Sequence, residues 1–197
     1  MSQRIVLASN NAGKLREFNH ILADQPVEVI AQAEFCFAEV EETGLSFVEN
    51  AILKARNASQ HTGLPAIADD SGIEVDALNG APGIYSARFA GEGATDQQNL
   101  EKLLRDMGDV ADLDRTARFQ CLLVYIRHAN DPTPQIFQGT WQGSILHQPR
   151  GENGFGYDPI FLVPDLQCSS AELEPAVKNR ISHRGQAMQK LLAQFHL

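Results

Sequence analysis

The stretch Leu64-Pro65-Ala66-Ile67-Ala68-Asp69-Asp70-Ser71-Gly72 places two adjacent carboxylates directly after a short apolar run. Residues 66–68 are typical of a buried strand, which we expect to end at the aspartates. Because side chains alternate between the two faces of a strand, Asp69 and Asp70 should point in different directions. A carboxylate at the carboxyl end of a buried strand can hold a divalent metal ion or orient a water molecule.

An ordinary turn is the alternative interpretation of the same residues, because Asp, Ser and Gly are all favoured in turns. Gly72 would let the chain turn sharply at this point. Apolar and acidic residues then alternate over residues 73–77, which indicates that the strand resumes or pairs back as a hairpin. These residues alone do not distinguish a turn from a functional site, so the other motifs of the chain are needed.

A helix preceded by an acidic loop leads into this stretch. Ser46-Phe47-Val48-Glu49 matches a capping box, which marks the start of a helix. Apolar residues at helical spacing extend the helix to about His61, and Gly63 is its expected stop. Glu41 and Glu42 lie in the loop before the helix, so the order loop, helix, strand can bring a glutamate near the aspartates.

The N-terminal residues predict a strand, a polar loop and a helix. Residues 5–8 are a compact apolar run, and apolar residues recur at helical spacing over residues 15–22. The loop between them, Ser9-Asn10-Asn11-Ala12-Gly13-Lys14, suits an anion, because backbone N–H groups and the helix dipole favour negative charge there. The glycine spacing of a Walker A loop is missing, and an ordinary capped turn is the alternative.

A β-hairpin is predicted in the second half of the chain. Residues 117–127 alternate between two apolar faces, and Asp131-Pro132-Thr133-Pro134 forces a turn. We expect residues 135–141 to be the partner strand and residues 143–146 to be a further short strand. Cys121 lies within the first strand and is expected in the core.

A glycine-rich stretch, Gly151-Glu152-Asn153-Gly154-Phe155-Gly156-Tyr157-Asp158-Pro159, isolates two aromatic residues beside an aspartate. Its glycines allow a close approach of the backbone, and Phe155 can stack on a flat ligand. A glycine-rich hairpin whose aromatic side chains pack inward is the alternative. Residues 160–163 then predict a final buried strand.

Three basic residues near the end of the chain form the last candidate cluster. Lys178 precedes Ser182, which is expected to cap a final helix, so that His183 and Arg184 fall in the first turn of that helix. Cations at this position oppose the helix dipole at a cost of about 0.3–1 kcal/mol, which a ligand oxygen or phosphate would offset. An exposed basic first turn is the alternative.

Length and composition limit the classes of protein that fit. The 197 residues suffice for one large domain or two closely joined lobes. The formal net charge of −9 argues against a nucleic-acid partner, so that phosphates have to be bound by a local basic pocket. Three widely spaced cysteines predict reduced thiols in a cytoplasmic protein. We find neither a signal peptide nor a membrane span, and therefore expect no membrane partner.

The clusters together suit a nucleoside triphosphate with Mg²⁺. Residues 9–14 suit phosphates, the acidic set suits a hard cation, and the glycine-rich stretch suits a planar base. The basic cluster suits anionic or carbonyl oxygens. The combination is more specific than any one cluster.

Seven motifs, in order along the chain, resemble those of the inosine/xanthosine triphosphate pyrophosphatases, especially the bacterial members. The resemblance runs from about residue 4 to about residue 193, on residues 9–14, 41–44, 46–51, 68–72, 83–88, 154–159 and 182–185. The family usually begins its first motif with Thr and often has Gly next. Ser9 keeps the hydroxyl, and Asn10 tolerates left-handed backbone better than most residues.

This resemblance implies both a fold and an activity. The fold would be α/β, a single domain over residues 1–197 with a long mixed β-sheet, flanking helices and two lobes around a central nucleotide-binding cleft. The activity would be hydrolysis of ITP, dITP and XTP to monophosphate and pyrophosphate, which removes deaminated purines from nucleotide pools. The resemblance also implies a homodimer whose partners are small-molecule purine nucleoside triphosphates.

We expect Mg²⁺-dependent attack of water at the α-phosphorus. Asp70 would bind Mg²⁺ and act as general base, with Glu41 as the first choice for a second metal ligand and Glu42 as the second. Asp69 would be a supporting carboxylate. The substrate would be contacted by Ser9, Asn10, Asn11, Ala12, Gly13, Lys14, Ser71, Phe155, Gly156, Tyr157, Asp158, Lys178, His183 and Arg184.

Two other classes of protein fit part of this pattern. A regulatory nucleotide-binding module would use the phosphate and base clusters, but it has little need of the acidic cluster. A phosphomonoesterase with an aspartyl nucleophile usually has its aspartates two apart on one loop, whereas Asp69 and Asp70 are adjacent. Release of pyrophosphate from dITP, release of orthophosphate, or no release distinguishes the three.

Arg184 and His183 also provide a hypothesis for discrimination against ATP. Hypoxanthine carries a carbonyl acceptor at position 6, where adenine carries an amino donor, and the Arg184 side chain offers only donors. A donor that faces a donor leaves both buried groups unsatisfied. Arg184→Ala should then lower kcat/KM for ITP much more than for ATP; an equal fall would mean that Arg184 binds phosphate or supports the fold.

Overall fold

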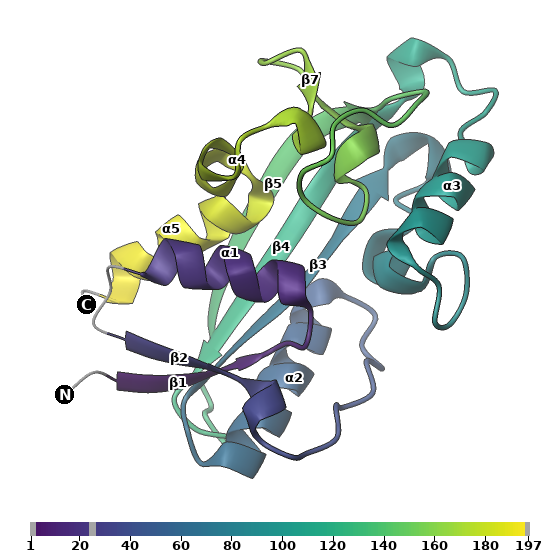
Figure 1. Ribbon diagram of the computed structural model, residues 1–197. Coiled ribbons are helices and arrows are strands. Elements are labelled where there is room, and N and C mark those ends of the chain that lie inside the picture. The colour runs from purple at the N-terminus through teal and green to yellow at the C-terminus, as the bar shows by residue number, and fades with distance from the viewer. Residues whose placement is uncertain (1–2, 24–26, 196–197) are drawn as a thin grey trace. The chain divides into compact units, whose positions relative to one another are not determined.

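The computed structural model describes residues 3–23 and 27–195, and Figure 1 shows their α/β fold. Within these residues, one seven-stranded sheet has the order β2-β1-β3-β4-β5-β6-β7. Strand β1 pairs in parallel with β2 and with β3, whereas the β5–β6 and β6–β7 pairs are antiparallel. The expected class, a mixed sheet with flanking helices, is confirmed.

The sheet has short strands at its edges and longer strands in its centre, and five α-helices accompany it among the described residues. The strands are β1 (Gln3–Ala8), β2 (Val27–Ala31), β3 (Ala66–Val75), β4 (Thr116–Ile126), β5 (Gln135–Ile145), β6 (Phe161–Val163) and β7 (Cys168–Ser169). The α-helices are α1 (Ala12–Leu22), α2 (Phe47–Thr62), α3 (Asp96–Asp106), α4 (Pro175–Ile181) and α5 (His183–Phe195). Among the described helices, none has the length and apolar character that a membrane span requires.

Local sequence signals set the helix boundaries near the aspartates. Asn11 caps α1 by accepting a hydrogen bond from the Lys14 N–H, and Ser46 caps α2 in the same way from the Glu49 N–H. Gly63 ends α2 with φ 69°, a left-handed conformation that costs glycine little. The helix predicted after residues 9–14 and both predicted ends of α2 are therefore confirmed.

The packing divides the chain into two compact units. The first unit contains Met1–Asp70, Cys121–Gly139 and Arg184–Leu197, and the second contains Ser71–Gln120 and Thr140–His183. Strands β3, β4 and β5 therefore contribute residues to both units.

Two apolar clusters on opposite faces of the sheet form the core of the first unit. Figure 1 shows α1 and α5 on one side of β1 and β2, and α2 on the other side. Alternation along β3 divides its residues between them: Ile67 packs in the cluster of α1 and α5, whereas Ala66 and Ala68 pack in that of α2. The same alternation predicts that Asp69 points to the face of α1 and α5, and Asp70 to the face of α2.

The core of the second unit is a separate apolar cluster. Leu100, Leu103 and Met107 follow the helical period of α3 and pack with strand residues, including Phe119, Trp141 and Phe161. The rings of Phe119 and Phe161 lie with their centroids 4.5 Å apart, a distance typical of aromatic pairs. Helix α3 and the strands of this region thus share one core.

The structure corrects several predicted boundaries. Strand β3 does not end at the aspartates but continues through Gly72 to Val75, as the alternation after Gly72 indicated, so the turn considered as an alternative is wrong. Residues 135–145 form one strand, β5, instead of two. Helix α4 and strand β7 lie in residues 165–181, where no strong pattern predicted an element. In the latter two cases pairing or packing with distant residues decided the structure, and the local sequence carried too little signal.

Candidate functional site

The two adjacent aspartates face opposite sides of the sheet, as predicted. The parallel ladder of β1 and β3 ends at the pair Ala8–Ala68, so Asp69 lies beside the loop that follows β1. Lys14, at the start of α1, places its Nζ atom 2.6 Å from Asp69 Oδ1. Asp70, on the other face, receives its hydrogen bond from Lys54 of α2 at 2.6 Å. The fold thus gives each carboxylate its own cation.

Asp69 is the centre of a buried charge network. Arg184 Nε lies 2.6 Å from Asp69 Oδ2, and the same guanidinium pairs with Glu17 of α1. The Cys121 thiol, buried as predicted, lies 3.5 Å from Asp69 Oδ2. Burial opposes ionisation of Asp69, but Arg184 and Lys14 outweigh it and hold the pKa of Asp69 well below its usual range. Asp69 is therefore ionised at neutral pH and holds Arg184 and Lys14 in place.

Asp70 has a different environment. Burial raises the pKa of Asp70, and the nearby Lys54 ammonium opposes this shift only in part. Lys54 also donates to Glu42 at 2.8 Å and to the Asp69 carbonyl at 3.0 Å. The Asp70 Oδ2 atom is buried and has no hydrogen-bond partner among the described residues. A buried carboxylate oxygen without a partner is where a metal ion or an ordered water would supply the missing contact.

The predicted phosphate loop, residues 9–14, has a defined conformation. The Ser9 hydroxyl accepts a hydrogen bond from the Asn11 N–H at 3.2 Å, and the Asn11 side chain accepts from the Lys14 N–H at 3.0 Å. Ala12 begins α1, so the first backbone N–H groups of the helix lie within the loop. This arrangement fits an anion at a helix N-terminus. The remaining side chain of the loop, Asn10, donates a hydrogen bond to the Glu39 carboxylate at 2.6 Å.

The acidic loop before α2 provides two candidate metal ligands. The Glu42 carboxylate is paired with Lys54, whereas Glu41 is exposed and its side chain has no hydrogen bond or ion pair among the described residues. No group of three or more metal-ligating side chains forms within the part of the chain that the structure describes. The donor set, which consists of carboxylate oxygens, fits Mg²⁺ in its chemistry, and Mg²⁺ commonly takes only one or two carboxylates from a protein.

The glycine-rich stretch of the second unit is built around Asp158. This carboxylate is buried and binds the Lys178 ammonium at 2.6 Å, the Ser170 hydroxyl at 2.8 Å and the Phe155 N–H at 2.9 Å. A Cβ atom on Gly154 would lie 2.1 Å from Asp158 Oδ2, so only glycine fits there. The structure thus brings together three residues predicted to contact substrate, Phe155, Asp158 and Lys178.

Two aromatic groups in the second unit have different surroundings. Lys178 Nζ lies 5.0 Å from the centre of the Phe155 ring, a cation–π distance. The Tyr157 side chain, in contrast, is buried, and its hydroxyl donates to the Ser86 carbonyl at 2.7 Å. Burial raises the pKa of Tyr157 above its usual range. Tyr157 packs inward as the alternative interpretation of this stretch proposed, so a ligand contact from this residue is left to its backbone.

The two basic residues that begin α5 are both buried. His183 stacks on Phe119, with ring centroids 4.7 Å apart, and lies 6.5 Å from Trp141. The Arg184 side chain is only 2% exposed, and Asp69 and Glu17 supply the negative charge that we expected from a ligand. The alternative interpretation, an exposed first turn, is therefore wrong.

Ser71, another residue predicted to contact substrate, follows Asp70 in β3 and is half-buried.

Lys54 and Glu17 are the residues near the aspartates that the sequence analysis missed. Lys54 had a detectable signal, because it is three residues after Ala51 and four before Ala58, both fully buried. A lysine on the buried face of a helix requires a charged partner. Glu17 had no comparable signal, since a glutamate near the middle of a surface helix is ordinary.

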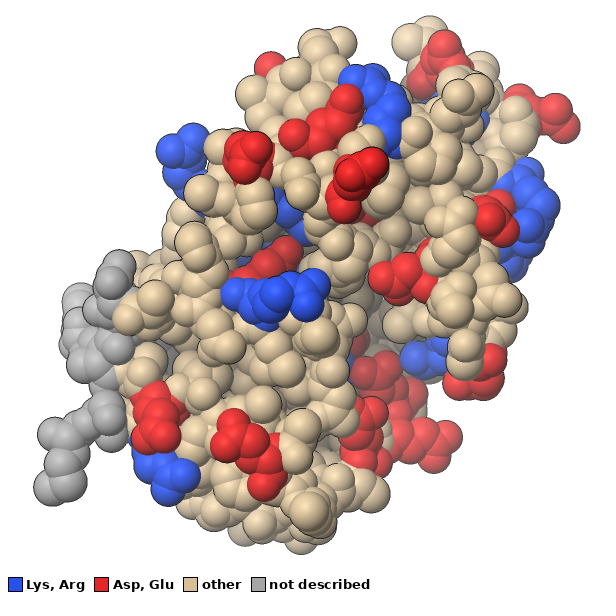
Figure 2. Space-filling model, in the orientation of Figure 1, with Lys and Arg blue, Asp and Glu red and all other residues tan. Residues whose placement is uncertain are grey.

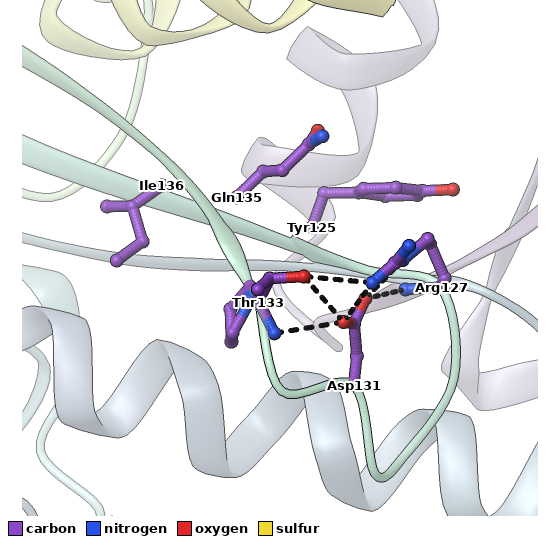
Figure 3. Close-up of a pocket in the computed structure, with 7 residues that line it drawn as sticks. Tyr125, Arg127, Asp131, Thr133, Gln135 and Ile136 are labelled. Carbon is purple, nitrogen blue, oxygen red and sulfur yellow. Dashed lines mark hydrogen bonds and ion pairs between the residues drawn. The ribbon is translucent and has the colours of Figure 1, made fainter.

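A separate pocket lies at the turn between β4 and β5 (Figure 3). It has a volume of about 440 Å³ and is lined by Tyr125, Arg127, Asp131, Thr133, Pro134, Gln135 and Ile136. Asp131 accepts hydrogen bonds from the Arg127 side chain at 2.6 and 2.8 Å and from the Thr133 N–H at 3.0 Å. This pocket contains none of the predicted substrate or metal residues, and its central arginine is already paired with a carboxylate.

Known proteins are similar to this chain in both sequence and structure. Relatives named dITP/XTP pyrophosphatase from Vibrio parahaemolyticus and Photobacterium profundum are 62% and 63% identical, over 98% and 96% of this chain and 96% of each relative. The solved structure of a HAM1 protein from Coxiella burnetii matches with a TM-score of 0.91 and 50% identity over 98% of both chains. The Staphylococcus aureus Ham1 protein matches with a TM-score of 0.86 and 47% identity, also over 98% of both chains.

The family model that matches covers almost the whole sequence. It is described as the Ham1 family and aligns with residues 5–194, which include all the motifs described above. High identity, coverage of both chains and a shared fold therefore agree, and the chain belongs to the Ham1 family.

Proposed function

We propose that this protein hydrolyses the triphosphates of deaminated purines, dITP, ITP and XTP, to the nucleoside monophosphate and pyrophosphate. The names of the curated relatives support this activity and substrate class. The observation that carries the proposal is Asp70, a buried carboxylate with one oxygen held by Lys54 and the other without a partner. A protein that only binds nucleotides has little need of such a group.

Asp70 is the proposed general base. Its Oδ1 atom is fixed by Lys54, so the orientation of the carboxylate is set before substrate arrives. Its Oδ2 atom would accept the proton of the water that attacks the α-phosphorus. Burial raises the pKa of Asp70 from its ordinary value, which makes the carboxylate a stronger base than an exposed aspartate.

Mg²⁺ is the proposed metal, with Asp70 and Glu41 as its protein ligands. Bound there, it would neutralise the charge that develops on phosphate oxygens. Glu41 remains the first choice because its carboxylate is exposed and neither oxygen has a hydrogen bond or ion pair among the described residues. Removing each carboxylate separately, as Glu41→Gln and Glu42→Gln, and comparing the Mg²⁺ dependence of the two variants tests this order.

The remaining predicted residues have two proposed tasks. The N-terminal turn of α1, with Lys14, would bind the triphosphate, because N–H groups at a helix N-terminus favour phosphate. Phe155 and backbone groups of the glycine-rich stretch would contact the base, and Asp158 would hold Lys178 in place. The homodimer and the cytoplasmic location expected from the resemblance stay predictions.

The test of the proposed function is a product assay. The purified protein is incubated with dITP and Mg²⁺, and pyrophosphate and orthophosphate are measured separately. Pyrophosphate as the product supports the proposal, whereas orthophosphate indicates a phosphomonoesterase and neither product indicates a binding module. Asp70→Asn, which keeps the shape of the side chain, should lower kcat by on the order of 10²–10⁴ while the protein stays folded.

A further inference from the structure

The acidic loop, residues 38–45, lies outside every helix and strand but is held along its length by one helix. Asn57 donates to the Ala38 carbonyl at 3.0 Å, and Lys54 donates to Glu42 at 2.8 Å. Asn50 accepts a hydrogen bond from the Gly44 N–H at 2.8 Å. Because Asn50, Lys54 and Asn57 are four and three residues apart, they lie on one face of α2, which therefore acts as the support of the loop.

Asn50 is the most buried member of this support. It is fully buried, its Oδ1 atom binds the Gly44 N–H, and its Nδ2 atom has no partner among the described residues. An unsatisfied amide in the interior is costly. An alanine or leucine would avoid that cost, so the amide at this position has to serve a purpose other than packing.

Gly44 fits against Asn50 so closely that a side chain has no room. A Cβ atom on Gly44 would lie 2.6 Å from Glu49 Cβ and 2.7 Å from Asn50 Oδ1. The neighbouring Leu45 N–H is also fixed, because it donates to the Glu49 side chain at 3.0 Å. The first turn of α2 therefore holds the end of the acidic loop by two backbone N–H groups.

The charge of the loop explains why it needs this support. Glu39, Glu41 and Glu42 lie within four residues, and like charges at this spacing repel one another. Figure 2 shows acidic side chains gathered over the region where the loop before α2 runs in Figure 1. Glu39 is held by Asn10 and Gln32, and Glu42 by Lys54, but Glu41 has no such contact among the described residues. The backbone therefore has to hold Glu41 in place.

We propose that Asn50 is a positioning residue which, by fixing the Gly44 N–H, places Glu41 of the acidic loop for Mg²⁺ binding. The inference rests on the proposed function, because it assumes that Glu41 is a ligand of the metal. In this proposal Asn50 acts through the backbone of the loop and does not itself bind the metal or the substrate. Its loss should therefore weaken the response to Mg²⁺, beyond any loss of stability.

The experiment compares Asn50→Ala with Gly44→Ala and with a matched control. Asn99→Ala is the control because Asn99 is also a buried helix asparagine that holds a loop N–H, that of Ala90, at 2.7 Å. For each variant, pyrophosphate release is measured over a range of Mg²⁺ concentrations, thermal unfolding gives Tm, and hydrogen exchange reports on the amides of residues 41–45.

Two results are expected together. Asn50→Ala and Gly44→Ala should each raise the Mg²⁺ concentration for half-maximal rate about tenfold, which corresponds to about 1.4 kcal/mol. Both should also speed exchange at the amides of residues 41–45 in the absence of Mg²⁺. Asn99→Ala should lower Tm to a similar degree but leave the Mg²⁺ dependence and this exchange unchanged.

Three other outcomes would bear on the role of Asn50. If Asn50→Ala lowers Tm without changing the Mg²⁺ concentration for half-maximal rate or the exchange of the loop, the role of Asn50 is structural and the inference is wrong. If Asn50→Ala does not fold, Gly44→Ala decides, since its Cβ displaces the same contact. If the unaltered protein releases no pyrophosphate, the proposed function fails, and exchange at residues 41–45 still decides whether Asn50 fixes the loop.

Discussion

Two adjacent residues of identical chemistry show how the fold assigns different tasks. Asp69 is buried between Arg184 and Lys14, which hold its pKa well below the usual range, whereas burial raises the pKa of Asp70. The alternation of side chains along β3 is the cause, because it sends one carboxylate to each face of the sheet. Asp69 is thereby a fixed charge, and Asp70 is the group suited to accept a proton.

Replacement of Lys54 tests the orientation of Asp70. Lys54→Met removes the ammonium that binds both Asp70 and Glu42, and we expect kcat for dITP to fall at least tenfold because the base loses its fixed geometry. Lys54→Arg keeps a positive charge and should retain more activity than Lys54→Met. Steady-state kinetics at saturating Mg²⁺ measure this, and an unchanged kcat in Lys54→Met would exclude Lys54 from the site.

Replacement of Arg184 tests the buried charge network. Arg184→Ala leaves the carboxylates of Asp69 and Glu17 without this cation, and the free energy of unfolding should fall by about 3–5 kcal/mol. Urea unfolding measures the change. Lys190→Ala is the control, because Lys190 lies on the same helix and, among the described residues, binds only the exposed Gln138 carbonyl; it should alter stability by about 0.5 kcal/mol or less.

The same variant addresses the hypothesis that Arg184 reads the purine base. Its guanidinium is buried and donates to two carboxylates, which favours a supporting role over a contact with the base. We therefore expect kcat/KM for ITP and for ATP to fall by the same factor in Arg184→Ala. A selective loss for ITP would restore the original hypothesis, and selectivity would then depend on Arg184.

At the scale of elements, α2 combines three functions in one helix. Its small buried residues, Ala51, Ala55 and Ala58, let it pack closely on the sheet. Lys54 reaches Asp70 from the same side, and Asn50 supports the acidic loop. Close packing by alanine is what brings the long lysine side chain within reach of β3, so the core and the candidate site depend on each other.

The turn between β4 and β5 provides a prediction on pH. Hydrogen bonds from Arg127 hold the pKa of Asp131 well below its usual value, so the carboxylate stabilises the folded state at neutral pH. Because the folded pKa is depressed, this contribution is present above about pH 3.9, the ordinary pKa of aspartate, and is lost as the pH falls further. Asp131→Asn should lower Tm by a few degrees at pH 7, and the difference from the unaltered protein should shrink below pH 4.

The control for this experiment is Thr133→Ala, which removes one weaker contact of Asp131 but leaves its charge pair with Arg127 intact. Its effect on Tm should be small and should depend little on pH above 4. A Tm difference for Asp131→Asn that stays constant from pH 3 to pH 7 would show that the ion pair contributes no stability.

At the scale of the whole molecule, the open prediction is the oligomeric state. The resemblance to the pyrophosphatase family implies a homodimer, so light scattering at micromolar concentration should give twice the monomer mass of 21.6 kDa. Asp70→Asn serves as a control, since loss of activity should not alter the mass. A mass of one chain at these concentrations would contradict the prediction.

The local features of this protein could be predicted from the amino-acid sequence. Capping residues and apolar periodicity located α1 and α2, the proline-containing segment 131–134 located the turn between β4 and β5, and alternation predicted that Asp69 and Asp70 diverge. These signals succeed because they depend on residues close together in the chain. The seven motifs also identified the family, because all of them occur in this sequence and in the same order as in the family.

Which charged side chains pair with one another, in contrast, depends on the packing of distant segments. Arg184 lies 115 residues from Asp69 in the sequence, and only the packing of α5 beside α1 brings them together. The partners of Lys54 were likewise set by contacts between distant segments. A long basic side chain has the same local propensity whether its partner is solvent, a ligand or a carboxylate, so its role is fixed only when the elements pack.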